Sequence, residues 1–288
     1  MMIDLHLHTT ASDGTESPAE LVAACRTAGL TIIAVADHDT IAGVAEVDAA
    51  ARAAGLRAVP GIEITAAWRE RDIHILGYFL DAESGGLAAF LDAQRKDRVR
   101  RARVIGDRLA GLGVPVDMEA LIVRAKGRPV VRPLIAAALV AAGHVATEQE
   151  AFERWLADGQ PAFVPRAGAT PADVVRAIRA AGGVSSLAHP GVTQGDGVIP
   201  ELIAAGLDAI EVYHPDHTGA DVARFRELAR ACGLAVSGGS DYHGARSHHA
   251  YGLGLVTLPA EDFEVLRQRA GRGPTGAPAM NRGVTRRG

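Results

Sequence analysis

The segment IDLHLHTTASDG, residues 3–14, decides how the rest of the sequence is interpreted. Its alternating apolar residues predict a β-strand. Because side chains two residues apart on a strand point to the same face, His6 and His8 project together, while the leucines between them face the other way. A hydrogen-bonded pair of core histidines would explain an isolated case. A metal ion is the alternative, and the other histidines of the chain decide between the two.

Short apolar segments alternate with alanine-rich helical patterns along most of the chain, which is typical of βαβ units and predicts an α/β fold with a barrel. After Phe79 the patterns are helical only, which predicts an all-helical cap inserted into the barrel. The last residues are rich in Gly, Pro and Arg without periodicity, and we expect them to be disordered. The expected strands are 2–7, 31–36, 57–63, 73–79, 184–188, 208–213 and 234–238. The expected domains are the first part of the barrel at 1–82, the cap at 83–165, the second part of the barrel at 166–270 and a disordered tail at 271–288.

Imidazoles and carboxylates follow the predicted strands at their carboxyl ends. In parallel βα barrels these ends form one rim, where active sites lie. The side chains offer nitrogen and oxygen donors and no thiolate, a set that suits Zn²⁺, Mn²⁺ or Fe²⁺. Their number is sufficient for two or three divalent ions that share carboxylates. The expected ligands are His6, His8, Asp13, His38, Glu63, His74, His189, Asp241 and His243.

The composition limits the other possibilities. The chain has 288 residues and a formal net charge of −4, so its overall field gives no reason to expect a non-specific binder of nucleic acid or membranes. Cys25 and Cys232 are far apart and have no metal-type spacing, which fits a reducing compartment. The sequence shows neither the basic and apolar segments of a secretory leader nor an apolar stretch long enough to span a membrane. We therefore expect a cytoplasmic protein with no membrane partner and no obligate protein partner.

The remaining histidines divide less clearly. His144, His248 and His249 are interpreted as solvated residues, and a loop role is favoured for His214. His217 follows the sixth strand, the one strand without an expected ligand. We expect His217 to contact the substrate.

The motifs HLHTTASDG, ADHDT, AHP and GGSDYH, in this order at strand ends, resemble those of the PHP (polymerase and histidinol phosphatase) superfamily of metal-dependent phosphoesterases. The likeness covers about residues 1 to 260. Further segments, such as AIEVYHPDHTGADVARF, are similar to the stand-alone bacterial branch that includes the TrpH/YciV-like enzymes. Leu134 and Asp158 depart from that branch, which often has histidine and lysine at these places.

The resemblance implies a distorted (β/α)7 barrel with a centre of two or three metal ions. It implies that Glu63 bridges the first two ions. Asp13 stands where some relatives have histidine. The implied ligands are His6, His8, Glu63 and Asp241 for the first ion, Glu63, His74 and His189 for the second, and Asp13, His38 and His243 for the third.

Two ions about 3.5–4 Å apart can hold a bridging hydroxide and clamp the oxygens of an in-line phosphoryl displacement. Glu63 and Asp241 are the expected catalytic residues, because they would hold the ions that carry this hydroxide. Arg132 in VVRP and Arg166 in FVPR are candidates for binding the outer phosphate oxygens, which a guanidinium group matches in geometry. The segment QRKDRVRRARVIGDR has seven basic and two acidic residues, and is either a solvated helix face or a surface for a polyanionic substrate.

Three functions are considered. The first is a phosphatase or phosphodiesterase that acts on small nucleotides, such as a nucleoside 3′,5′-bisphosphate, an AMP-like 5′-phosphate or a short 5′-phosphorylated oligonucleotide. The second is a phosphatase for small metabolites, such as histidinol phosphate or a cyclic sugar phosphate. The third, a non-enzymatic scaffold, is disfavoured by the full ligand set. The basic segment and the likeness to the nucleotide-acting branch favour the first.

Overall fold

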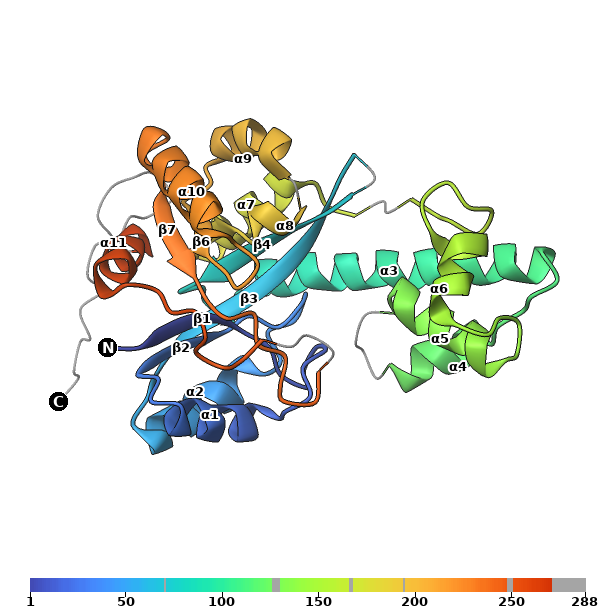
Figure 1. Ribbon diagram of the computed structural model, residues 1–288, viewed down its shortest axis with the longest axis horizontal. Helices are drawn as coiled ribbons and strands as arrows, with labels where there is room; N and C mark the ends of the chain where they lie inside the picture. Colours follow the sequence, from blue (N-terminus) through green and yellow to red (C-terminus); the bar gives the residue numbers. More distant parts are fainter. Residues whose placement is uncertain (70, 126–129, 166–167, 194, 248–250, 271–288) are drawn as a thin grey trace. The chain divides into compact units, whose positions relative to one another are not determined.

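The computed structural model describes residues 1–69, 71–125, 130–165, 168–193, 195–247 and 251–270. Within these ranges, a mixed α/β chain forms a barrel-like sheet of seven strands in the order β1 to β7 (Figure 1). The seven strands expected from the sequence are confirmed, with ends shifted by at most two residues except in β3, which runs to Trp68 and not to residue 63. Their bounds are β1 Ile3–Leu7, β2 Ile32–Val35, β3 Arg57–Trp68, β4 Arg71–Tyr78, β5 Val184–Leu187, β6 Ala209–Tyr213 and β7 Ala235–Gly238.

One strand departs from the parallel pattern that the repeated βαβ units predict. Strands β1, β2 and β3 are parallel, as are β5, β6 and β7, but β4 is antiparallel to β5. Parallel neighbours need a crossover of about a dozen residues or more, and only residues 69 and 70 separate β3 from β4. The reversal puts the first half of β4, which contains His74, at the rim formed by the carboxyl ends of the other strands.

The segment after β7 lies beside the end of β1 and brings the two edges of the sheet together. His8 N donates to the carbonyl oxygen of Tyr242 at 2.9 Å, and Leu7 forms a parallel bridge with Tyr242. The buried carboxylate of Asp4 accepts hydrogen bonds from Ser240 N (2.9 Å) and Ser240 Oγ (2.6 Å). The first and last strands are therefore fixed to each other directly beneath the histidines.

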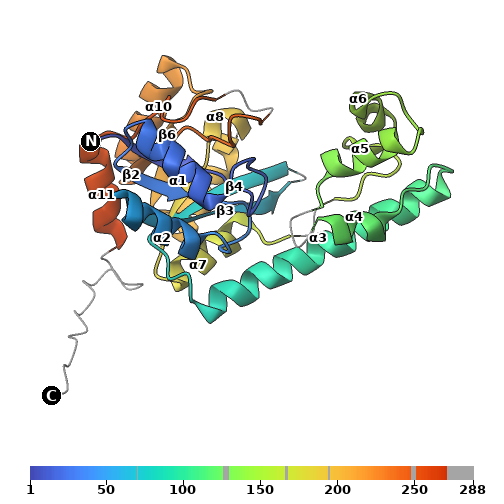
Figure 2. The ribbon, with the colours of Figure 1, turned by 90° about the horizontal axis from the view of Figure 1, so that it is seen from below.

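Helices pack around the sheet, and further helices lie outside it along the chain between β4 and β5 (Figures 1 and 2). The first begins with a capping box, in which Ser17 and Glu20 satisfy each other's backbone N–H groups. The α-helices are α1 Pro18–Thr27, α2 Val44–Ala54, α3 Gly85–Gly111, α4 Met118–Arg124, α5 Arg132–Ala141, α6 Glu148–Ala151, α7 Pro171–Ala180, α8 Pro190–Thr193, α9 Ile199–Ala205, α10 Gly219–Ala231 and α11 Ala260–Ala270, with a π-helical turn at Phe152–Leu156 and a 3₁₀ turn at Gly195–Val198.

The chain divides into two compact units. The barrel unit contains Met1–Ala66, Ile73–Ala88 and the described residues from Pro171 onward, and the helical unit contains Ala67–Asp72 and the described residues of Ala89–Thr170. Each unit has its own core. In the barrel unit, α1 and α2 pack on the outer face of β1 and β2 through residues such as Leu21, Val47 and Ile33. In the helical unit, α3, α4 and α5 enclose a core that includes Ile105, Leu121 and Ile135.

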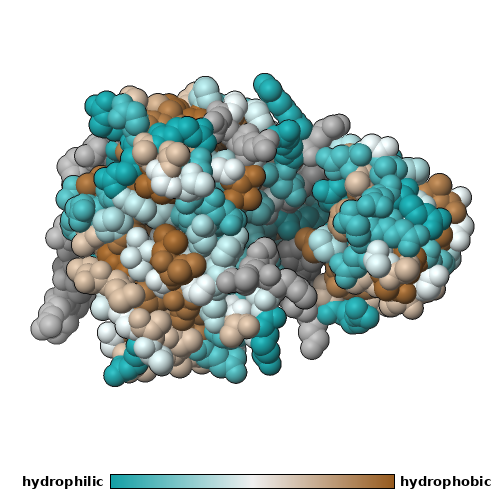
Figure 3. Space-filling view, in the orientation of Figure 1, coloured by the Kyte–Doolittle hydropathy of each residue, from teal (hydrophilic) through white to brown (hydrophobic). Residues whose placement is uncertain are grey.

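No helix among the described residues is long and apolar enough to cross a membrane. On the face of the barrel unit seen in Figure 3, hydrophobic residues form small groups among hydrophilic ones.

The closure at Gly239 gives a test of the fold. A Cβ at this position would lie 2.6 Å from His6 Cβ and 2.7 Å from Asp4 Oδ1, closer than atoms can pack. We expect Gly239→Ala to lower the free energy of unfolding of the barrel by about 1–3 kcal/mol or more, measured by denaturant titration. Gly85→Ala is the matched control, because a Cβ there meets no atom within 4 Å. Equal stability of the two variants would contradict the packing described.

Candidate metal centre

The rim brings together the nine residues that the sequence predicts as ligands. His6 lies in β1, Glu63 in β3 and His74 in β4, and the others follow β1, β2, β5 and β7 directly. His189 and Asp241 have positive φ angles of 27° and 51°. Such conformations are uncommon for residues other than glycine and are concentrated at functional sites.

Glu63 stands at the centre of this group. Its side chain is 1% exposed, and its two oxygens face different imidazoles. Oε1 lies 2.9 Å from His74 Nδ1 and 3.1 Å from His189 Nε2. Oε2 lies 3.2 Å from His6 Nε2, 3.4 Å from His8 Nε2 and 3.2 Å from His38 Nδ1. One carboxylate thus separates two groups of nitrogen donors.

Asp241 completes the group around His6 and His8. Its Oδ1 lies 3.3 Å from His6 Nε2 and 3.1 Å from His8 Nε2. His6, His8 and Asp241 therefore offer ligand atoms within 4.8 Å of one another, and Glu63 Oε2 lies beside both imidazoles.

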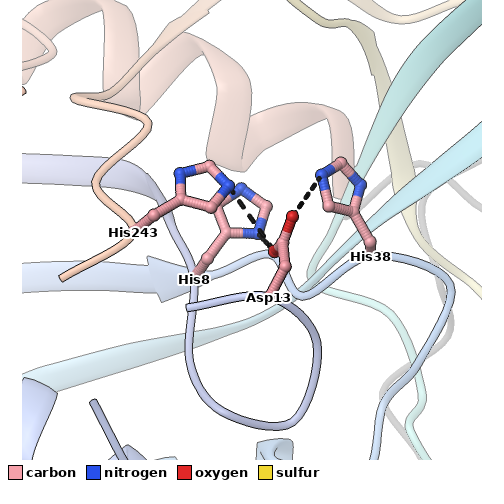
Figure 4. A group of neighbouring side chains, drawn as sticks. All are labelled: His8, Asp13, His38 and His243. Atoms are coloured by element: carbon pink, nitrogen blue, oxygen red, sulfur yellow. Dashed lines mark ion pairs between the residues drawn. The ribbon is translucent and has the colours of Figure 1, made fainter. Parts of the chain in front are cut away.

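A third group consists of Asp13, His38 and His243 together with His8 (Figure 4). Asp13 Oδ1 is 3.5 Å from His243 Nε2 and 3.7 Å from His8 Nδ1, and Asp13 Oδ2 is 3.8 Å from His38 Nε2. The Asp13 side chain is 53% exposed, whereas His8 and His243 are buried. His243 Nδ1 donates to the carbonyl oxygen of Asp241 at 2.8 Å, so Nε2 is the nitrogen that faces Asp13.

Asp37 supports the loop that carries Asp13. Its buried carboxylate accepts hydrogen bonds from Thr9 N at 2.8 Å, Thr9 Oγ1 at 2.6 Å and Ser12 Oγ at 2.6 Å. The loop is thereby attached to the end of β2, and the motifs HLHTTASDG and ADHDT form one structural unit.

The donors fit divalent ions. Both ring nitrogens of His8, and Nδ1 of His38, His74 and His189, are buried without a hydrogen-bond partner. Buried polar atoms are normally paired, and each unpaired one is costly. Here the unpaired nitrogens of His8, His38 and His74 face carboxylates, in groups whose ligand atoms lie within 4.8 Å of one another. Nitrogen and oxygen donors of this kind suit a transition metal and do not by themselves select one.

The charges of the site also fit the binding of divalent ions. Burial raises the pKa of Glu63, but the imidazoles of His38, His74 and His6 outweigh it and hold that pKa well below its usual range. Burial lowers the pKa of His6, but the three carboxylates around it outweigh burial and raise that pKa well above its usual value. The carboxylates therefore stay ionised and attract positive charge, either a proton on His6 or a metal ion.

Two residues of the site were missed in the sequence. Glu211 is buried in β6 and contacts His6, and His214, for which a loop role was favoured, is buried with Nε2 3.4 Å from Asp241 Oδ2. The signal for Glu211 was a single acid inside the apolar strand AIEVY. His214 gave no signal beyond its nearness to that strand.

Three residues are expected from the sequence to contact the substrate: His217, Arg132 and Arg166. His217 is buried, with Nδ1 donating to the carbonyl oxygen of Val212 at 2.8 Å and Nε2 accepting from Gly191 N at 3.2 Å. Its contact with substrate stays a prediction. Arg132 lies in the helical unit, where Nη1 is 2.7 Å from Asp158 Oδ1. Arg166 lies outside the described residues. Binding of phosphate by these arginines stays a prediction.

Known proteins resemble the chain in sequence and in structure. The family model of the PHP domain matches residues 4–138. A 5′-3′ exoribonuclease of Haemophilus influenzae is 36% identical over 245 residues, which are 83% of this chain and 89% of that protein. A 3′,5′-nucleoside bisphosphate phosphatase of Chromobacterium violaceum is 34% identical over 247 residues, 84% of this chain and 87% of that one.

Two further proteins extend the comparison. A phosphoribosyl 1,2-cyclic phosphate 1,2-diphosphodiesterase of Eggerthella lenta is 34% identical over 253 residues, 85% of this chain and 95% of that one. A crystal structure from Bifidobacterium adolescentis, of a protein described as a metal-dependent phosphoesterase, has a TM-score of 0.77 at 32% identity and covers 93% of this chain and 96% of that chain. The resemblance drawn from the four motifs is thus confirmed, and the chain belongs to the PHP domain family.

Proposed function

We propose that this protein is a metal-dependent phosphoesterase that hydrolyses phosphate esters of small nucleotides. The observation that carries the proposal is the buried Glu63 carboxylate, whose two oxygens face two separate groups of imidazoles. Such a carboxylate is suited to hold two ions close together, as phosphoester hydrolysis at paired ions requires. Bound ions supply an activated water and Lewis acids for the phosphoryl oxygens.

We propose the following ligands. Glu63 would belong to two sites, and His38 faces both Glu63 and Asp13 through its two nitrogens. Glu63 and Asp241 are the residues we assign to the catalytic step, because their carboxylates would hold the ions that activate the water. The first ion would be held by His6, His8, Glu63 and Asp241, the second by Glu63, His74 and His189, and the third by Asp13, His38 and His243.

The names of the relatives support nucleotides as the substrate class. An exoribonuclease and a nucleoside bisphosphate phosphatase each align with more than four fifths of this chain. Both act on phosphoesters of nucleotides by name, so a nucleoside 3′,5′-bisphosphate or a short 5′-phosphorylated RNA is the proposed substrate. The relative named for a cyclic phosphoribosyl substrate supports the alternative, a phosphodiesterase or phosphatase of small sugar phosphates.

Several cationic side chains of the basic helix α3 form ion pairs inside the helical unit. Arg100 and Arg103 form ion pairs with Asp97 and Glu119, at 2.7 Å and 2.6 Å. Lys96 pairs with Asp92 at 2.7 Å. The charge of the segment is therefore balanced in good part by its own neighbours.

Substrate class can be tested directly with Mn²⁺-loaded protein. The panel consists of adenosine 3′,5′-bisphosphate, AMP, a short 5′-phosphorylated RNA, histidinol phosphate and a ribose cyclic phosphate, with released phosphate and nucleotide both quantified. We expect the bisphosphate or the RNA to give the highest kcat/KM, and a chelator to abolish hydrolysis until Mn²⁺ is restored. A preference for a sugar ester would replace the substrate proposed, and chelator-resistant hydrolysis would contradict the metal mechanism.

The shared carboxylate is tested by Glu63→Gln. The amide keeps the shape but offers one neutral oxygen in place of two anionic ones, so we expect fewer bound ions per chain by elemental analysis and a loss of hydrolysis of more than about 100-fold. Glu46→Gln, at an exposed position on α2, is the control and should change neither. A metal-replete, active Glu63→Gln variant would show that this carboxylate bridges nothing.

A further inference from the structure

Strand β6 supplies no ligand to the metal centre, yet it contributes a buried carboxylate to it. Glu211 is 0% exposed, and both of its oxygens are used. Oε1 lies 2.9 Å from His6 Nδ1, and Oε2 accepts a hydrogen bond from the backbone N–H of His189 at 2.8 Å. Glu211 thus contacts one residue from each side of the Glu63 carboxylate.

The contact with Glu211 decides which nitrogen of His6 is free. An ionised carboxylate can only accept, so His6 Nδ1 must carry the hydrogen. In the neutral ring that binds a metal, the lone pair of His6 is then on Nε2, which faces Glu63 Oε2 at 3.2 Å and Asp241 Oδ1 at 3.3 Å. A histidine that binds a metal commonly donates its other N–H to a carboxylate in this way.

The loop after β6 sets the opposite tautomer in His214. Its Nδ1 accepts a hydrogen bond from Asp216 N at 3.2 Å, so the hydrogen of the neutral ring is on Nε2. That Nε2–H points to Asp241 Oδ2 at 3.4 Å. His214 therefore donates a hydrogen bond to Asp241 Oδ2. The other oxygen, Asp241 Oδ1, remains directed at His6 and His8.

We propose that Glu211 and His214 are positioning residues of the first metal site: Glu211 fixes the tautomer and orientation of His6, and His214 fixes the carboxylate of Asp241. This inference rests on the proposed metal-dependent function. Strand β6 would then support the metal site through Glu211, although no side chain of β6 binds an ion.

The test is a titration of chelator-treated, full-length protein with Co²⁺, followed by visible absorption and by elemental analysis. For Glu211→Gln we expect Co²⁺ affinity to fall about 10- to 100-fold, with an altered absorption spectrum, because the amide cannot accept from both His6 and His189. Glu227→Gln is the control, since Glu227 is exposed on α10 and pairs only with Arg230 among the ion pairs of the described residues. It should bind Co²⁺ as the wild type does.

His214 provides an independent pair of variants. His214→Phe removes the donor and should weaken Co²⁺ binding and alter the spectrum. His214→Gln places an amide N–H near the original Nε2 and should restore most of the wild-type affinity, which a loss of packing alone would not allow. This pair of variants tests the positioning role even if Glu211→Gln does not fold.

The outcomes separate the two proposals. A wild-type protein that binds no Co²⁺ would overturn the metal-dependent function and this inference with it. A wild type that binds Co²⁺, together with unchanged affinity and spectra in Glu211→Gln and His214→Phe, would overturn the positioning role alone.

Discussion

The site depends on one buried carboxylate surrounded by imidazoles. Glu63 is almost fully removed from water, and five histidines point a ring nitrogen at its two oxygens. Burial of an ionised carboxylate is costly unless positive charge or hydrogen bonds compensate it. The imidazoles supply part of this compensation and hold its pKa low, and divalent ions between the donors would supply the rest. The fold around Glu63 is consequently organised to hold many weak bases at fixed places.

Other buried acids hold the backbone that carries these bases. Asp37 attaches the loop after β1 to the end of β2, and Asp4 attaches β1 to the segment after β7. Burial raises the pKa of Asp4 to about 6, an effect that the hydrogen bonds from Ser240 offset only in part. Glu211 extends the same arrangement to His6 and His189. Each of these carboxylates connects segments far apart in the sequence, which explains how ligands from six strands and their following loops come to share one rim.

Much of the fold and of the ligand set could be predicted from the sequence, for definite reasons. Strands such as Ile3–Leu7 combine period-2 polarity with apolar residues, and ligand-type side chains at strand ends must meet wherever strands are neighbours. The direction of β4 was not predicted, because it depends on the short connection at residues 69–70 and not on the composition of the strand. Glu211 and His214 were missed because they act on the far side of other ligands, and such contacts leave no spacing pattern. The pairing of Arg132 with Asp158 joins residues 26 positions apart in irregular surroundings, which no periodicity reveals.

Anomalous X-ray scattering from crystals grown with Mn²⁺ would show whether Glu63 is shared between ions. We expect two strong manganese peaks on opposite sides of the Glu63 carboxylate, one near His6, His8 and Asp241 and the other near His74 and His189. A third peak beside Asp13 would complete the set. A single peak, or peaks out of reach of Glu63, would show that this carboxylate is not shared.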